Sequence, residues 1–182
     1  MGEAVSLSTG AGALEVNLFA GGGLHEPPVR QARVLLVDDS QHDVTLAKYY
    51  LFGANGVDCD LKVARTGADA MDQLLMAAAA GHPIDLVLLD VSLPGHNGFA
   101  LLGQIRAHPY LRKTSVIMCT GSSHEADRNQ ALDHGVAGYL IKPPKLDTFR
   151  TVVAHVPLLD IQGAGDHLRL VAVSLERSRI YD

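Results

Sequence analysis

The sequence predicts an α/β protein built on a doubly wound, five-stranded parallel sheet. Five short runs rich in Val, Leu and Ile have the length of buried strands. The segments between them carry apolar residues at helical spacing, so strands and helices alternate along the chain. This alternation favours parallel pairing, because each helix crosses from the end of one strand to the start of the next. Helices are therefore expected on both faces of the sheet.

The first half of this region is expected to hold three strands and two helices. "RVLLV" (33–37) is a continuous apolar run, typical of a strand buried on both faces, and the spacing of apolar residues predicts a helix over 41–54. "VDCDLKVA" (57–64) alternates apolar and polar residues, as a half-buried edge strand does. An Ala- and Leu-rich helix over 67–81 ends in a glycine, and "IDLVLL" (84–89) is a second buried strand.

The second half continues the same pattern after a turn. "LPGHNG" (93–98) holds the Pro, Gly and Asn residues that favour turns. We expect helices over 99–107, 124–134 and 146–155 and strands over 115–119 and 137–141.

Composition and charge narrow the class of protein. Hydrophobic residues make up 47% of the 182 residues, enough for one packed domain with appendages. The formal net charge of −5 argues against a nucleic-acid binder that depends on phosphate contacts. Cys59 and Cys119 form no metal or redox motif and are expected to be buried free thiols. Without a signal peptide or an apolar run long enough for a membrane span, the expected location is cytoplasmic.

The chain is expected to divide into three parts. Residues 1–31 hold six glycines by residue 30 and the pair Pro27-Pro28, which indicates a flexible leader. The alternating strands and helices occupy residues 32–156. Residues 157–182 form a C-terminal extension.

Polar residues directly follow the buried strands. Asp38 and Asp39 come after the first, Asp90 after the third, Thr120 after the fourth and Lys142 after the fifth. In doubly wound folds ligands bind at the carboxyl ends of the strands, so these five side chains are expected on one rim. Three adjacent carboxylates repel one another unless a cation binds, and Mg²⁺ is the cation that carboxylates favour. The alternative is that each acid only caps the following helix.

This set of groups suits phosphoryl transfer onto an aspartate. An ionised carboxylate needs no general base, and Mg²⁺ and a lysine offset the charge of the phosphoryl oxygens. "LLVDDS", "LVLLDVSLPGHNG", "MCTGSS" and "GYLIKPP" occur in this order, and together they make residues 32–156 resemble the receiver domain of bacterial two-component response regulators. The resemblance implies a flavodoxin-like fold. Asn97 departs from the family pattern, in which an acid is common before Gly98.

The resemblance also implies a role for each residue at the rim. Asp90 would be the phosphoacceptor. The Mg²⁺ ligands would be Asp90 itself, Asp39 directly, Asp38 mainly through water, and the backbone carbonyl of Ser92. Thr120 would hydrogen-bond the phosphoryl group, and Lys142 would pair with it.

Two further residues carry over from the family. Tyr139 matches the switch aromatic, which turns inward when Thr120 moves toward the phosphate. Pro143 would follow a cis peptide bond. Taken on its own, Tyr139 also fits an ordinary half-buried strand tyrosine.

The resemblance implies partners as well. A sensor histidine kinase would donate the phosphoryl group, and a histidine phosphotransfer protein is one candidate recipient. "HPYLRKTSVIM" (108–118) resembles single-domain receivers whose kinases are phytochromes, a subgroup in which homodimers are common. No DNA-binding or enzymatic domain fits into 157–182, so we expect a stand-alone receiver that is not an enzyme acting on a separate metabolite.

The C-terminal segment "LRLVAVSL" (168–175) is apolar and must be covered. We favour a β arm exchanged between two subunits. A strand folded back on its own domain is about equally supported, and a helix also fits the spacing. The residues of the expected arm are Leu168, Leu170, Val171, Val173 and Leu175.

Three functions follow from these features. The leading hypothesis is a response regulator phosphorylated on Asp90. A phosphatase with an aspartyl intermediate would place a second Asp two residues after the nucleophile, where this chain has Ser92. The remaining alternative is a dimeric pseudo-receiver that works as a scaffold without phosphorylation.

Overall fold

The computed structural model describes residues 29–53, 56–93, 97–121, 135–165 and 167–173. Five parallel strands form the central sheet in the order β4-β2-β5-β6-β7, which is the flavodoxin-like order 2-1-3-4-5 of these strands. The predicted doubly wound parallel sheet is therefore confirmed. The strands are β2 (Arg33–Val37), β4 (Asp60–Ala64), β5 (Leu86–Asp90), β6 (Ser115–Thr120) and β7 (Gly138–Ile141).

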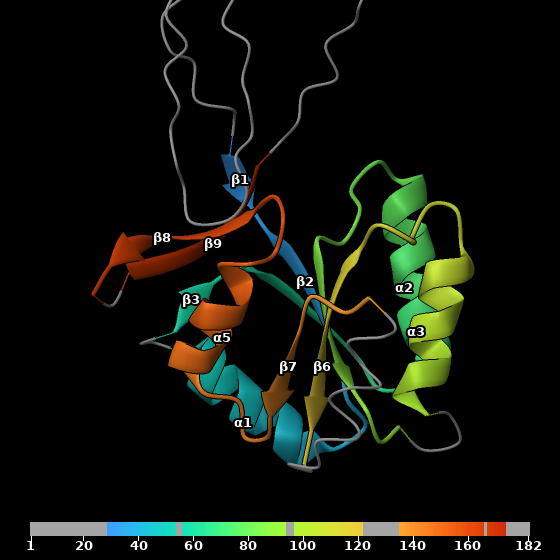
Figure 1. The fold of residues 1–182 in the computed structure, drawn as a ribbon, viewed down its shortest axis with the longest axis horizontal. Coiled ribbons are helices and arrows are strands. Elements are labelled where there is room, and N and C mark those ends of the chain that lie inside the picture. The colour runs from blue at the N-terminus through green and yellow to red at the C-terminus, as the bar shows by residue number, and fades with distance from the viewer. Residues whose placement is uncertain (1–28, 54–55, 94–96, 122–134, 166, 174–182) are drawn as a thin grey trace, which may run out of the picture.

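Helices cover both faces of this sheet (Figure 1). The helices α1 (Gln41–Leu51) and α5 (Leu146–Val153) lie on one face, and α2 (Gly67–Ala79) and α3 (Gly98–Ala107) lie on the other. The predicted helix over 124–134 falls outside the described residues. No helix that the structure describes is long and apolar enough to cross a membrane.

Successive residues of a strand pack into two separate hydrophobic cores, because neighbouring side chains point to opposite faces of the sheet. Leu36 and Leu88 belong to the core under α1 and α5, and Leu35 and Leu89 belong to the core under α2 and α3. All four are at most 2% exposed. This burial on both faces explains why the central strands read as continuous apolar runs.

Three helices begin at a polar residue that caps them. The side chains of Ser40, Thr66 and Asn97 accept hydrogen bonds from the backbone N–H groups of Asp43, Asp69 and Phe99. The caps Ser40 and Thr66 lie two or three residues after the ends of β2 and β4, and Asn97 comes after β5. The capping residues thereby fix how each strand's last residues lead into the next helix.

The predicted strand 57–64 is two strands that belong to different sheets. β3 (Val57–Asp58) pairs with the C-terminal strand β9 (His167–Val173), whereas β4 pairs with β2. The chain turns from one sheet to the other at Cys59. Alternation of apolar and polar residues continues through this break, so the sequence pattern contains no sign of it.

A second sheet forms around β9. β8 (Leu159–Ala164) pairs antiparallel with one side of β9. On its other side β9 pairs with β3 and with β1 (Val29–Gln31), which the sequence analysis placed in the leader. The backbone N–H of Ala32 donates to Leu170 and its carbonyl accepts from Asp60, so this residue joins the two sheets.

The C-terminal segment is therefore a strand in its described part, and the helical interpretation was wrong. Leu168, Leu170 and Ala172 are buried and extend the core under α1 and α5. The preceding strand β8 was not predicted, because in "LDIQGA" apolar and polar residues alternate only over 159–162. Gly163, near the end of β8, has φ of 111°, and a Cβ there would lie 1.9 Å from the carbonyl oxygen of His167. Leu175 lies outside the described residues.

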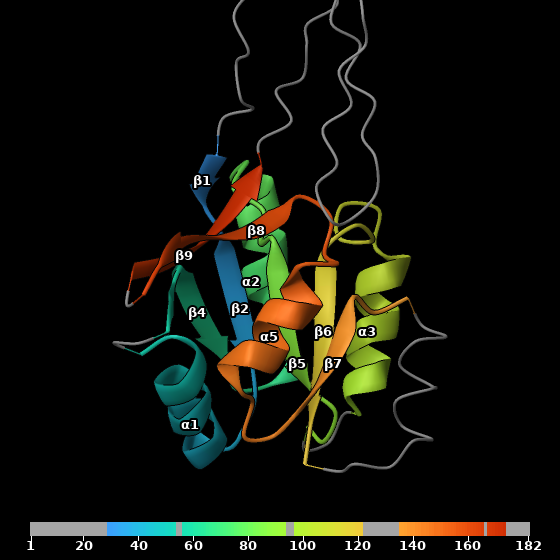
Figure 2. The same cartoon turned by 60° about the vertical axis from the view of Figure 1, so that its left-hand side comes forward.

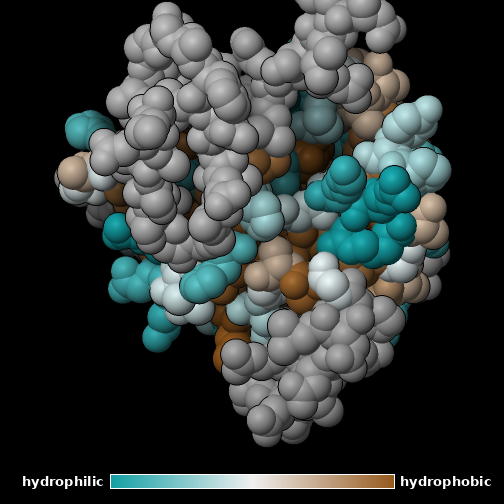
Figure 3. Space-filling view, turned by 45° about the horizontal axis from the view of Figure 1, so that its top comes forward, coloured by the Kyte–Doolittle hydropathy of each residue, from teal (hydrophilic) through white to brown (hydrophobic). Residues whose placement is uncertain are grey.

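The added sheet lies at the end of the molecule opposite the carboxyl ends of the parallel strands (Figures 1 and 2). Arg30 of β1 ties it to the central domain by two hydrogen bonds of 2.7 Å to the Asp85 carboxylate, which also accepts the Arg33 N–H at 2.8 Å. Where described residues face the viewer in Figure 3, hydrophobic ones appear in patches between hydrophilic ones. β1 thus pairs with β9 and is bonded to the residue that precedes β5.

We predict that Asp85→Asn lowers the free energy of unfolding by about 1–2 kcal/mol. The amide is uncharged and has one oxygen, so it cannot accept both hydrogen bonds from Arg30. Urea unfolding followed by circular dichroism measures the change. Asp72→Asn on the exposed side of α2 is the matched control and is expected to stay within about 0.5 kcal/mol of the unmodified chain. Equal stability of the two variants would show that the Arg30 pair does not hold β1.

Candidate functional site

The polar residues predicted to share a rim lie at the carboxyl ends of four neighbouring strands. Asp38 follows β2, Asp90 ends β5, Thr120 ends β6 and Lys142 follows β7. Asp38, Asp90 and Thr120 are only 2%, 4% and 2% exposed, although they are polar. Asp39 is exposed beside them. Burial of two carboxylates is costly unless their charge is compensated, so this arrangement demands a cationic partner.

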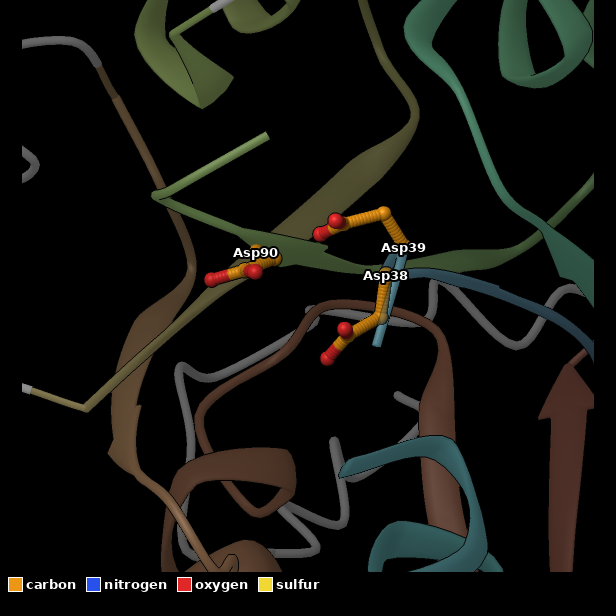
Figure 4. Close-up of side chains that lie close together, drawn as sticks. All are labelled: Asp38, Asp39 and Asp90. Carbon is orange, nitrogen blue, oxygen red and sulfur yellow. The ribbon is translucent and has the colours of Figure 1, made fainter. Parts of the chain in front are cut away.

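Three carboxylates converge on one space (Figure 4). Asp38, Asp39 and Asp90 each contribute an oxygen atom, and these atoms lie within 4.8 Å of one another. Oxygen atoms at this separation fit a hard divalent cation such as Mg²⁺, which takes carboxylate and carbonyl oxygens together with water. The donor set therefore suits the predicted ion. The backbone carbonyl of Ser92 stays a predicted ligand.

The ammonium group of Lys142 compensates the buried carboxylates. Its Nζ lies 2.7 Å from Asp38, 2.9 Å from Asp90 and 3.1 Å from Asp43. Burial alone would lower the pKa of Lys142, but the hydrogen bonds to Asp38 and Asp90 outweigh it and raise the pKa above the ordinary value. Lys142 therefore stays charged.

The opposite balance holds at Asp38. Burial raises the pKa of this carboxyl, and the hydrogen bond from Lys142 lowers it without cancelling the effect of burial. One lysine thus does not make up for the water that Asp38 has lost. A divalent cation bound at the cluster would favour the ionised form further.

The two buried carboxylates are held in the same way. The Oδ1 atom of Asp38 accepts the backbone N–H of Ser40 at 2.9 Å, and the Oδ1 atom of Asp90 accepts that of Ser92 at 3.1 Å. In both residues Oδ2 is the atom that contacts Lys142. Each carboxylate is thereby oriented by its own turn before any ligand binds.

Two residues at this site were missed by the sequence analysis. Asp43, in the first turn of α1, is the third carboxylate on Lys142. Arg65 follows β4 and directs Nη1 to the backbone carbonyls of Asp38 and Asp39, both at 3.4 Å. An acid in a first helical turn is ordinarily explained by the helix dipole, so only the spacing of Asp43 from the Asp pair carried any signal.

Tyr139 and Pro143 lie on and just after β7. The peptide bond between Lys142 and Pro143 is cis, the isomer that the family resemblance implies. The ring of Tyr139 packs against the core under α2 and α3. Its hydroxyl is buried and has no hydrogen-bond partner among the described residues. The role of Tyr139 as a switch stays a prediction.

The strand order and the acidic cluster define a doubly wound α/β domain of the receiver class. The model of the response regulator receiver domain matches residues 34–154, and the chain belongs to this family. This confirms the family predicted from the four motifs.

Individual relatives agree with this family. The chain is 32% identical over 128 residues to a probable cyclic di-GMP phosphodiesterase of Vibrio cholerae, covering 68% of this chain and 26% of the relative. The bacteriophytochrome response regulator AtBRR has a similar structure, with a TM-score of 0.62, 27% identity, and coverage of 70% of this chain and 93% of that one. The Mn²⁺-bound form of response regulator Rcp1 is also similar, with a TM-score of 0.53 and 31% identity. This match covers 66% of this chain and 88% of that one.

The solved structures support the narrower resemblance to phytochrome response regulators, because AtBRR is named as one. The chain spans between 26% and 43% of the length of the first curated relatives, which include transcriptional regulators. The similarity to them concerns the receiver domain.

We predict that Gly98→Ala destabilises the site, because an added Cβ would lie 2.1 Å from the backbone carbonyl oxygen of Asp90. The expected loss in the free energy of unfolding is about 1–3 kcal/mol. Gly103, on the exposed side of the same helix α3, meets nothing within 4 Å and is the matched control. Gly103→Ala should raise stability by about 0.5–1 kcal/mol. Urea unfolding of both variants checks the prediction, which fails if their effects have the same sign.

Proposed function

We propose that the chain accepts a phosphoryl group on Asp90 from a phosphohistidine of a sensor histidine kinase. The observation that carries this proposal is the position of Asp90, which lies at a strand end between a lysine and two further carboxylates. Water would screen the charge of an exposed carboxylate and would reach its acyl phosphate, whereas Asp90 is buried and is oriented by the backbone N–H of Ser92. The protein would assist its own phosphorylation and would not act on a separate metabolite.

The reaction transfers one phosphoryl group. An oxygen of the Asp90 carboxylate attacks phosphorus, the bond between phosphorus and the histidine nitrogen breaks, and that nitrogen keeps the electron pair. Lys142 holds positive charge beside the reacting oxygen and would pair with the phosphoryl group, and Thr120 would donate a hydrogen bond to it. Mg²⁺, when bound by Asp39, Asp90 and Asp38, would offset the charge of the phosphoryl oxygens.

The signal would leave through a protein surface. Thr120 and Tyr139 lie on neighbouring strands, so movement of Thr120 toward the phosphoryl group would bias the packing of Tyr139. A net charge of −5 disfavours binding to nucleic acid. The partner that reads this surface is a protein, either a downstream receptor or a histidine phosphotransfer protein. A cytoplasmic location suits the free thiols Cys59 and Cys119.

A phytochrome-type kinase is the proposed donor. The support is the sequence of residues 108–118 together with the likeness to AtBRR and to Rcp1. In this chain the segment runs from the end of α3 into β6, and Arg106 of α3 donates to the backbone carbonyl of Thr114 at 2.9 Å. The local structure of the segment is thus set by the end of α3.

We also propose that the β8–β9 hairpin can exchange between two copies of the chain. Its residues pair with β1 and β3, and these contacts are the same whether one chain or two supply them. The hairpin is joined to α5 through Leu158, a non-glycine residue with φ of 64°. Straightening the chain there would relieve an unfavourable backbone conformation, which favours exchange.

Phosphorylation is tested by intact-mass measurement after incubation with acetyl phosphate and Mg²⁺. We expect the unmodified chain to gain one phosphoryl group and Asp90→Asn to gain none. Removing Mg²⁺ with a chelator should also abolish the gain, because the metal offsets charge in the transition state.

Asp72→Asn, on the exposed side of α2, is the control for loss of a carboxylate and should be phosphorylated normally. If the unmodified chain gains no phosphoryl group from acetyl phosphate or from a cognate kinase, the scaffold alternative replaces the proposed function. Phosphorylation of Asp90→Asn would place the acceptor elsewhere.

Strand exchange is tested with a disulfide between β1 and β9. Val29 and Val173 are directly opposed partners, so the double variant Val29→Cys with Val173→Cys should form a bond on oxidation. An exchanged dimer gives covalent dimers on a non-reducing gel, and a closed monomer gives a cross-link within one chain. The single variants control for other disulfides. Cross-links within one chain at high protein concentration would refute the exchange.

A further inference from the structure

We infer that Asp43 is a positioning residue for phosphoryl transfer, and that it acts by holding the ammonium group of Lys142 beside Asp90. This inference rests on the proposed function of Asp90. A lysine ammonium group has three N–H donors, and three carboxylates surround that of Lys142. Asp43 is the one of them that belongs to neither the acid pair nor the phosphoacceptor.

The three partners of Lys142 differ in what happens to them during the reaction. Asp38 and Asp90 belong to the carboxylate cluster that fits a divalent cation. A bound ion, and a phosphoryl group on Asp90, would therefore compete with Lys142 for their oxygens. Asp43 is not a member of that cluster. It is therefore the partner that Lys142 keeps when the other two are engaged.

The position of Asp43 is itself fixed by the acid pair. The backbone N–H of Asp43 donates to Oγ of Ser40 at 3.2 Å, and the backbone N–H of Ser40 donates to Oδ1 of Asp38 at 2.9 Å. Lys142 contacts both Asp38 and Asp43, so these residues and Ser40 form a closed ring of contacts. A side chain on the first turn of α1 is thus coupled to the strand that carries the site.

Holding the ammonium group matters because a free lysine side chain loses rotamer freedom when it is ordered. The Lys142 side chain is 13% exposed, and Asp43, at 31%, is the more exposed of the pair. Asp43 is also more exposed than Asp38 and Asp90, so its contact would keep the ammonium group of Lys142 from turning toward solvent. Preorganised charge of this kind costs nothing to arrange when the phosphoryl group arrives.

The test measures the rate constant of phosphorylation by acetyl phosphate at saturating Mg²⁺. Asp43→Asn should slow the reaction by about three- to tenfold, the effect of losing one partly exposed charged hydrogen bond. Asp43→Glu should recover most of the rate. Asp147→Asn, a carboxylate in the first turn of α5, changes the net charge equally and should leave the rate unchanged.

A comparison in the Lys142→Ala background separates positioning from a general effect on the fold. If Asp43 acts through Lys142, Asp43→Asn has no further effect once Lys142 is removed. An equal slowing in that background, or an Asp43→Asn variant as fast as the unmodified chain or faster, would overturn the inference. An unmodified chain that gains no phosphoryl group would overturn the proposed function and this inference with it.

Discussion

The contact of one lysine with three carboxylates is the interaction on which the site depends. Two of these carboxylates are buried at the ends of adjacent parallel strands, where an uncompensated charge would oppose folding. Lys142 follows the edge strand β7, and its ammonium group contacts carboxylates at the ends of both β2 and β5. The site therefore forms only when all these strands are in register. In this way the electrostatics of the rim and the topology of the sheet specify each other.

The opposite end of the sheet is closed by different means. β9 pairs with β1 and β3, each of which continues into a strand of the central sheet after one residue. Leu170 and Ala172 extend the core under α1 and α5 beyond the parallel strands. The chain thus buries apolar surface at one end and leaves the charged rim at the other. The residues that stabilise the fold thus lie at one end of the strands and the reactive residues at the other. The rim can therefore hold polar residues that contribute little to stability.

Local sequence predicted the central sheet well because its strands are buried on both faces and followed by polar residues. It failed where structure depends on a distant partner. "VDCDLKVA" alternates without interruption, and only the pairing of Val57 with β9 divides it into two strands. β8 carries only a short apolar alternation, Leu159 and Ile161, and it is a strand because β9 lies beside it. Asp43 was missed for the same reason, since its contact with Lys142 spans 99 residues of sequence.

These long-range contacts bear on how a receiver of this kind would work. The ammonium group of Lys142 contacts three carboxylates at 2.7–3.1 Å, so a phosphoryl group that pairs with Lys142 must replace one of these acceptors. Lys142 directly follows β7, the strand that carries Tyr139, so a change of partner at Lys142 would act on this strand. A partner retained throughout, as proposed for Asp43, confines that exchange to the oxygens of Asp38 and Asp90. The charge change would then be passed to β7 as a shift in geometry and would not be lost to solvent by an outward turn of the lysine.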